Sequence, residues 1–215
     1  RAAPTEEAEP PKKRVTSIVG QPEDAIPLGE GKWQIGKAVF DLTAPILLYD
    51  ENEENTGENL PYDKPIADPT PLSRLDHPVR GVTVVGQVDT VECKDSFDGS
   101  TTVITVGITD YQSSIQLSMR LPKEQAAPLC GQLLSAGRTI RRGVQEVVTV
   151  YNLALCATGY VRREKPRRLR PGESPVPDEE RDFILIPSRI LKVKRVLRQD
   201  DAPVKRVELH LHTNL

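Results

Sequence analysis

Two histidines near the end of the chain have the spacing of a metal-binding pair. His210 and His212 are separated by one residue within the alternating run 205–213. Alternation along a strand places both imidazoles on one face, where they could share a divalent metal ion. A complete site needs further His, Asp or Glu ligands, and the remaining histidine, His77, is distant in sequence. We therefore expect an incomplete metal site, and two histidines without a metal are the stronger expectation.

Basic residues gather in the second half of the chain, where they could neutralise nucleic-acid phosphates. The net charge of the whole chain is -2, so any attraction for nucleic acid must be local. A solvated basic loop is the alternative interpretation of residues 162–170. The cluster comprises Arg138, Arg141, Arg142, Arg162, Arg163, Lys165, Arg167, Arg168 and Arg170.

Aromatic side chains could add base stacking to these phosphate contacts. Phe97 falls at a predicted hairpin tip and is the better stacking candidate. Tyr111 is instead expected to cap the end of a β-barrel, the fold predicted below. Aromatic residues form only 4% of the chain, which excludes a broad stacking platform. Arg120 is predicted to point outward from a strand. The candidate nucleic-acid contacts are Phe97, Arg120, Arg138, Arg141, Arg142, Tyr151, Arg162 and Arg163.

Features of an enzyme active site are missing from the sequence. It contains no Gly-rich phosphate loop and no evident pairing of a nucleophile with a base. The acidic run 50–58 has no surrounding framework and is expected to be solvated. We therefore predict no catalytic residue and no cofactor in this chain.

Cysteine usage and hydropathy indicate a cytoplasmic protein. Cys93, Cys130 and Cys156 are far apart and odd in number, so buried free thiols in a reducing compartment are expected. No apolar run approaches the roughly 20 residues of a membrane span, so no membrane partner is predicted.

The elements that must position these residues are mostly strands. Alternating apolar residues predict three meandering strands over 81–93, 101–110 and 113–121, with the Asp98-Gly99 turn joining the first two. A short helix is predicted over 122–137. Further strands are expected over 138–151 and over 181–190, and residues 152–161 could continue as another strand.

This element order predicts an all-β fold with one short helix, a five-stranded OB-fold barrel. An SH3-like barrel or partial β-sandwich would lack the helix. We predict the barrel domain over 81–198, with a loop insertion at about 150–180 between strands four and five. Residues 1–80 are Pro-rich and acidic and are expected to be a linker, with a possible short hairpin at 31–49 that could cover a sheet edge.

Several motifs resemble one family. The run KRVELHLHT at 205–213 is similar to the opening strand of a PHP domain, and KPIADPTPLSRLD, VTVVGQV, ITDYQSSI and RDFILIP followed by VKRV resemble the OB-fold region before it. The family is the PolC-type DNA polymerase III alpha subunit of Gram-positive type. The resemblance covers roughly 64–215 and implies that 199–215 are a linker and the first strand of a truncated PHP domain.

The resemblance implies a single-stranded nucleic-acid-binding module of a replicative polymerase, non-catalytic by itself. The parent chain would be a DNA polymerase with 3′–5′ exonuclease, and its PHP domain would bind divalent metal through residues including His210 and His212. Expected partners are single-stranded DNA, other polymerase domains and replisome proteins. Gly107 and Ser118 replace outward lysines of the family, which favours the alternative of a protein-interaction or spacer domain. A fragment of a metal-dependent PHP phosphoesterase is the third hypothesis.

Overall fold

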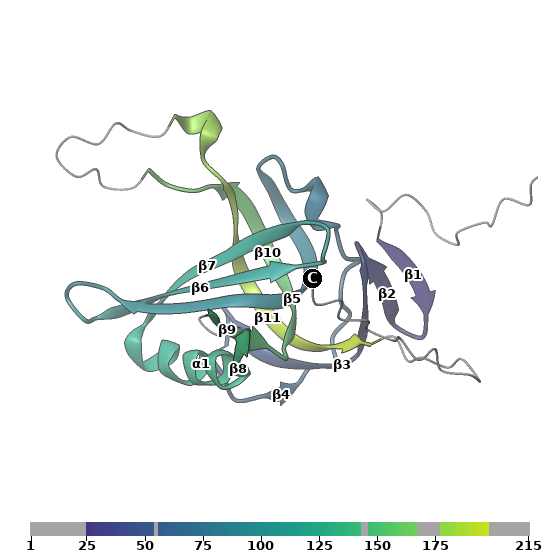
Figure 1. Ribbon diagram of the computed structural model, residues 1–215, viewed down its shortest axis with the longest axis horizontal. Helices are drawn as coiled ribbons and strands as arrows, with labels where there is room; N and C mark the ends of the chain where they lie inside the picture. The colour runs from purple at the N-terminus through teal and green to yellow at the C-terminus, as the bar shows by residue number, and fades with distance from the viewer. Residues whose placement is uncertain (1–24, 54–55, 143–145, 167–176, 198–215) are drawn as a thin grey trace, which may run out of the picture.

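The computed structural model describes residues 25–53, 56–142, 146–166 and 177–197, and within them strands predominate. The single α-helix of this part of the chain, α1 (Lys123–Ser135), lies against one end of the strands (Figure 1). The described protein is therefore mostly β with one helix, as the sequence predicts.

Five strands close into a ring. β5 (Val79–Asp95) pairs with β6 (Thr101–Thr109), and β6 pairs with β7 (Ser114–Pro122). On its other side β5 pairs with β10 (Ala154–Arg163), which pairs with β11 (Phe183–Val196). The start of β11 runs parallel to β7 and closes the ring. With α1 between its third and fourth strands, this ring has the element order predicted for an OB-like barrel.

The ring interior is filled by the inward-facing half of each strand. Ile104, Val106 and Ile108 of β6 and Leu117 of β7 are fully buried, two residues apart along each strand as a pleated strand requires. Two apolar residues of α1, Leu129 and Leu133, are also fully buried and belong to the same cluster. We call this cluster the barrel core.

The region expected to be a linker is largely folded onto the barrel. β1 (Ile26–Gly29), β2 (Lys32–Ile35) and β3 (Ala38–Asp50) form a meander, β4 (Leu60–Pro61) pairs with β3, and η1 (Leu72–Arg74) is a short 3-10 turn. β3 pairs with the second half of β11, which extends the sheet beyond the ring.

This meander covers the outside of the barrel wall and creates a second core. Phe40 of β3 and Ile35 of β2 are fully buried with Val85, Cys156 and Leu191, which lie on the outward faces of barrel strands. We call this cluster the outer core. Apolar residues on the outward face of the barrel would be exposed to water without the meander. Burying them favours paired strands over 25–50 in place of an extended linker.

The expectation of a solvated acidic run is wrong at its first residue. Asp50, at the end of β3, has only 3% of its side chain exposed. Its carboxylate accepts a hydrogen bond from Arg189 Nε at 2.7 Å and another from the Asn52 backbone amide at 3.0 Å. The Arg189 guanidinium also lies 5.1 Å from the centre of the Tyr62 ring. This ion pair connects the outer meander to β11.

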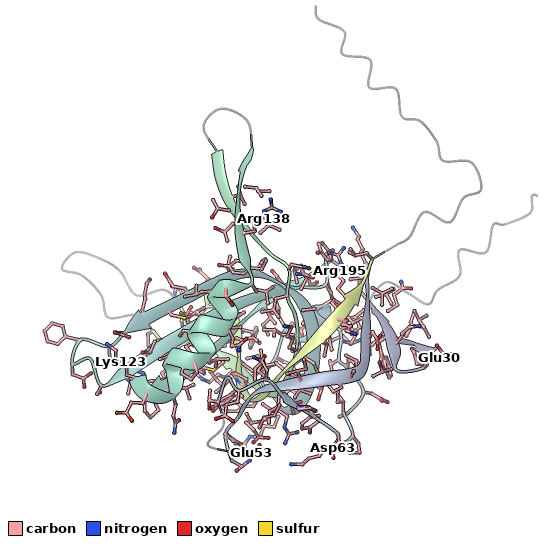
Figure 2. All side chains as sticks on the ribbon, turned by 90° about the horizontal axis from the view of Figure 1, so that it is seen from below. Glu30, Glu53, Asp63, Lys123, Arg138 and Arg195 are labelled. Atoms are coloured by element: carbon pink, nitrogen blue, oxygen red, sulfur yellow. The ribbon has the colours of Figure 1, made fainter. Side chains whose placement is uncertain are left out.

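The fourth barrel strand differs from the one expected. Residues 138–151 do not enter the ring, because β8 (Gly137–Arg142) and β9 (Glu146–Tyr151) form a separate two-stranded hairpin. The hairpin, marked by Arg138 in Figure 2, stands away from the ring. The barrel strand is β10, so the predicted insertion at 150–180 contains a core strand. The connection between the fourth and fifth strands is 164–182, which includes η2 (Asp178–Glu180).

Candidate nucleic-acid interface

The structure brings three basic side chains from separate elements into one hollow on the outside of the ring. Arg120 comes from β7, Arg162 from β10 and Lys165 from the connection after β10. Arg120 alternates with the inward Met119 and Leu121, and Arg162 with the inward Val161, so both face outward. The outer-face hollow measures about 490 Å³ and is lined by Val103, Ser118, Met119, Arg120, Tyr160, Arg162, Lys165 and Ile186.

The charge of the outer-face hollow suits an anion. Its lining contains Arg120, Arg162 and Lys165 and no carboxylate. The Arg162 guanidinium donates a hydrogen bond to the backbone carbonyl of Arg163 at 3.0 Å, which restrains its position. Guanidinium and ammonium groups held in this way can bind phosphate oxygens. The geometry therefore fits a phosphate-bearing ligand.

An aromatic ring that the sequence analysis missed borders the same hollow. Tyr160 is 43% exposed and lies two residues before Arg162 on the outward face of β10. The signal in the sequence was the alternation of Tyr160 with Arg162, but it was hidden because β10 was not recognised as the fourth barrel strand. An exposed ring beside basic groups can stack on a nucleobase.

The neighbouring part of the face is acidic. A β-bulge between Val88 and Thr90 displaces Asp89, and the side chains of Asp89 and Thr90 occupy the space that a Cβ atom on Gly107 would need. This packing explains why glycine stands at an outward position of β6. The Asp89 carboxylate also limits the attraction of this part of the face for phosphate.

Phe97 lies at the tip of the hairpin between β5 and β6, with its whole side chain exposed. The Asp98 carboxylate accepts hydrogen bonds from the Ser96 hydroxyl at 2.5 Å and from the Ser100 amide at 3.1 Å. These hydrogen bonds lower the pKa of Asp98 to about 2. The turn is thus internally bonded, and it presents Phe97 to solvent.

Arg163 makes several contacts within the chain. Its guanidinium lies 4.4 Å from the centre of the Phe183 ring and donates hydrogen bonds to the carbonyls of Glu179 and Arg181, each at 3.0 Å. These contacts join the two ends of the connection 164–182. Arg163 therefore positions this connection beside the outer-face hollow.

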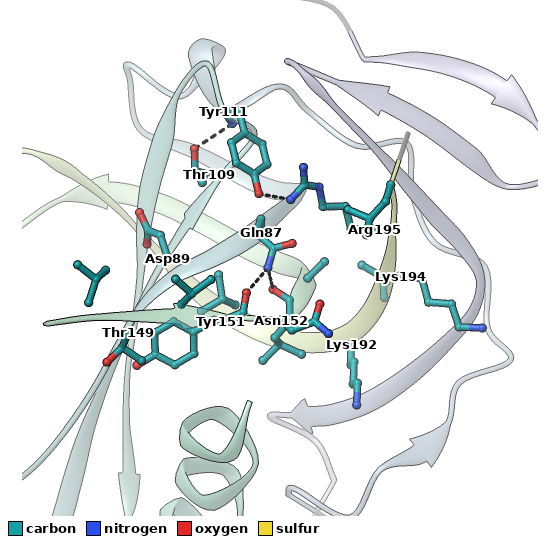
Figure 3. Close-up of a pocket in the computed structure, with 17 residues that line it drawn as sticks. Gln87, Asp89, Thr109, Tyr111, Thr149, Tyr151, Asn152, Lys192, Lys194 and Arg195 are labelled. Atoms are coloured by element: carbon teal, nitrogen blue, oxygen red, sulfur yellow. Dashed lines mark hydrogen bonds between the residues drawn. The ribbon is translucent and has the colours of Figure 1, made fainter. Parts of the chain in front are cut away.

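The remaining predicted contacts lie on the β8–β9 hairpin. Arg138 is an exposed residue of β8, and Arg141 and Arg142 are the last two residues of that strand. Tyr151 is half-buried and lines a different groove, between β9 and the end of β11 (Figure 3). The structure thus separates these residues from Arg120 and Arg162, and the predicted contacts do not form one surface.

Two curated proteins are similar to this chain over most of its length. It is 30% identical over 161 residues to "DNA polymerase III PolC-type" of Halalkalibacterium halodurans, which is 73% of this chain and 9% of the relative. It is also 30% identical over 152 residues to the Bacillus cereus protein of that name, which is 70% of this chain and 8% of the relative. The chain contains a PolC-related region. It spans less than a tenth of either relative's length, and no family model matches it.

The predicted metal ligands of this PolC-related chain, His210 and His212, lie outside the described residues. Within the described residues, no three His, Cys, Asp or Glu side chains are grouped so as to hold a metal ion. The helix found in this part of the chain is too short and too polar to cross a membrane.

Proposed function

We propose that this chain is a single-stranded nucleic-acid-binding module of a replicative DNA polymerase. It would bind the template strand near the polymerase site of the parent protein and would be non-catalytic by itself. The observation that carries the proposal is the convergence of Arg120, Arg162 and Lys165 in the outer-face hollow. The PolC relation supports the setting of DNA replication.

Binding would be driven by the phosphate backbone. Arg120 and Arg162 would bind successive phosphates, and Lys165 would add a contact from the mobile end of a long side chain. The exposed Tyr160 ring would stack on one base without reading its identity. Two or three phosphate contacts on a single strand predict a log-log salt slope of about −2. Binding should therefore be weak, sequence-tolerant and strongly dependent on salt.

Fluorescence anisotropy of a labelled oligothymidylate, titrated with the whole chain at low and moderate salt, tests the proposal. The double variant Arg120→Ala/Arg162→Ala should weaken binding about tenfold or more, since each phosphate contact is charge-assisted. The matched control Arg141→Ala/Arg142→Ala removes the same charge from the hairpin and should change binding less. A larger loss in the hairpin variant would place the interface on β8, and no binding even at low salt would exclude the proposal.

A protein-interaction or spacer role within the polymerase is the second candidate. The fully exposed Phe97 ring at a well-bonded turn and the Asp89 carboxylate beside Gly107 favour it. An oligonucleotide that fails to bind at low salt, together with retained folding, would favour this role. Phe97→Ala would then be the variant to test against other segments of the polymerase.

A further inference from the structure

A second concave surface lies on a different part of the molecule from the outer-face hollow. This edge groove measures about 830 Å³ and lies between β9, the end of β11 and the middle of β5 (Figure 3). Two runs of consecutive residues, 148–154 and 192–195, line most of it. A sheet face is lined by alternate residues, so consecutive residues show that strand edges border the groove.

Both bordering strands leave an edge unpaired within the described residues. β9 pairs with β8 alone. β11 pairs with β3 as far as Val196, whereas its ladder with β10 ends at Val193. The last residues of β11 therefore have one paired side and one open side. Open strand edges are sites at which another extended chain can add.

Two hydrogen bonds from Gln87 show how the backbone is directed at the end of β9. The Gln87 side-chain amide donates to the carbonyls of Tyr151 at 2.7 Å and Leu153 at 2.9 Å (Figure 3). The Tyr151 carbonyl is therefore directed toward β5 and away from β8. Alternation along the strand directs the backbone groups of Thr149 to the same side, which is the side of the groove.

The side chains around the edge groove combine apolar walls with a basic rim. Val148 and Val150 line the β9 side, and Lys192, Lys194 and Arg195, all exposed, line the β11 side. The Arg195 guanidinium lies 4.4 Å from the Tyr111 ring centre and donates to its hydroxyl, which holds it at the groove. Among the residues that line the groove, Asp89 is the one carboxylate.

We propose that the edge groove binds an extended acidic segment of a partner protein as an added β-strand. The backbone of the segment would bond to the open edge at Thr149. Its apolar side chains would pack on Val148 and Val150, and its carboxylates would face Lys192 and Lys194. Single-stranded DNA would satisfy the basic rim but has no amide backbone to pair with a strand edge. The peptide therefore fits more of the observations.

A fluorescein-labelled peptide in which glutamate alternates with valine, titrated with the whole chain at low salt, tests this proposal by anisotropy. Binding is expected, and a peptide with lysine in place of glutamate should not bind. Lys192→Glu/Lys194→Glu should weaken binding about tenfold or more, because two attractions become repulsions. Thr149→Pro should weaken it to a similar degree, because proline removes an amide donor on the open side of β9.

Thr149→Val is the matched control, since it keeps the amide and the branched side chain and should bind like the natural chain. Circular dichroism of each variant checks that the fold is retained. Equal binding by Thr149→Pro would overturn strand addition. A different pattern would assign the groove to nucleic acid and overturn the proposed peptide partner. In that pattern oligothymidylate displaces the peptide, and oligonucleotide binding is lost in Lys192→Glu/Lys194→Glu but kept in Arg120→Ala/Arg162→Ala.

Discussion

The barrel core and the outer core share a wall but are built differently. Most barrel-core residues come from the continuous segment that runs from η1 through β5, β6 and β7 to α1, and residues of β3, β10 and β11 complete the cluster. The outer core joins β2 and β3 to β5 and to β10 and β11, the last two more than a hundred residues later in the chain, and the part-buried Asp50–Arg189 pair joins β3 to β11. Most of the barrel core thus comes from one continuous segment of alternating strands and a helix, while the outer core depends mainly on strands that are distant in sequence and is bordered by an ion pair.

Removing the largest fully buried side chain of the outer core should have the largest effect on stability. Phe40→Ala takes away a fully buried ring and leaves a cavity between β3 and the barrel wall. We expect the free energy of unfolding to fall by about 3–5 kcal/mol in urea denaturation. The control Leu28→Ala, at a half-exposed position of β1, should change it by less than about 0.5 kcal/mol. A Phe40→Ala effect as small as the control would mean that the outer meander contributes little to the fold.

Breaking the buried ion pair should have the next largest effect, and it should depend on pH. Burial raises the pKa of the Asp50 carboxyl, but the Asn52 amide and Arg189 lower it by more, so the folded pKa lies below its usual value. The pair therefore stabilises the fold above pH about 4, and this contribution is lost as pH falls through the lower folded pKa. Asp50→Asn removes the charged acceptor of the Arg189 and Asn52 hydrogen bonds and should cost about 1.5–3 kcal/mol at pH 7, measured by urea denaturation.

The same measurement below pH 4 should bring the natural chain and Asp50→Asn closer together. Asp63→Asn, at an exposed position labelled in Figure 2, serves as the control and should leave the pH dependence unchanged. A constant difference between Asp50→Asn and the natural chain at all pH values would contradict the assigned charge effect.

The smallest expected difference between the two cores is in the labelling of their cysteine thiols. This measurement tests directly whether the cores unfold together. Burial raises the pKa of Cys156, in the outer core, to about 12, and burial and the neighbouring Cys130 thiol raise that of Cys93, against the barrel core, to about 12. Neither should react appreciably with iodoacetamide at pH 8 in the folded chain. With increasing urea, mass spectrometry should show both becoming labelled together, because β10 belongs to both cores. Earlier labelling of Cys156 would mean that the outer core opens alone.

The sequence predicted the parts of the fold whose evidence is local. The strands β5, β6 and β7 and the helix were recognised because apolar residues such as Ile104, Val106 and Ile108 alternate in one short window. The fourth strand was misplaced because Val147, Val148 and Val150 have higher β-propensity than the small residues of β10. Those small residues are explained by packing on both faces of β10, which only the assembled structure reveals.

The candidate interface was predicted only in part, because it too depends on which strands lie side by side. Arg120 and Arg162 were identified by their charge, and the ring brings them together. Tyr160 was missed, and the contact of Arg163 with Phe183, 4.4 Å from the ring centre, was not foreseen. Neither could be resolved from composition, because each depends on which strand neighbours which.

The β8–β9 hairpin begins and ends at one place, since Gly137 at its start is the pairing partner of Tyr151 at its end. A segment with adjoining ends can be exchanged as a cassette without moving the strands on either side. Shorter turns, reporter tags or whole inserted domains could be carried there while the ring remains intact. The position after α1 is accordingly a natural point for tailoring this scaffold, and a route by which related chains could diversify it.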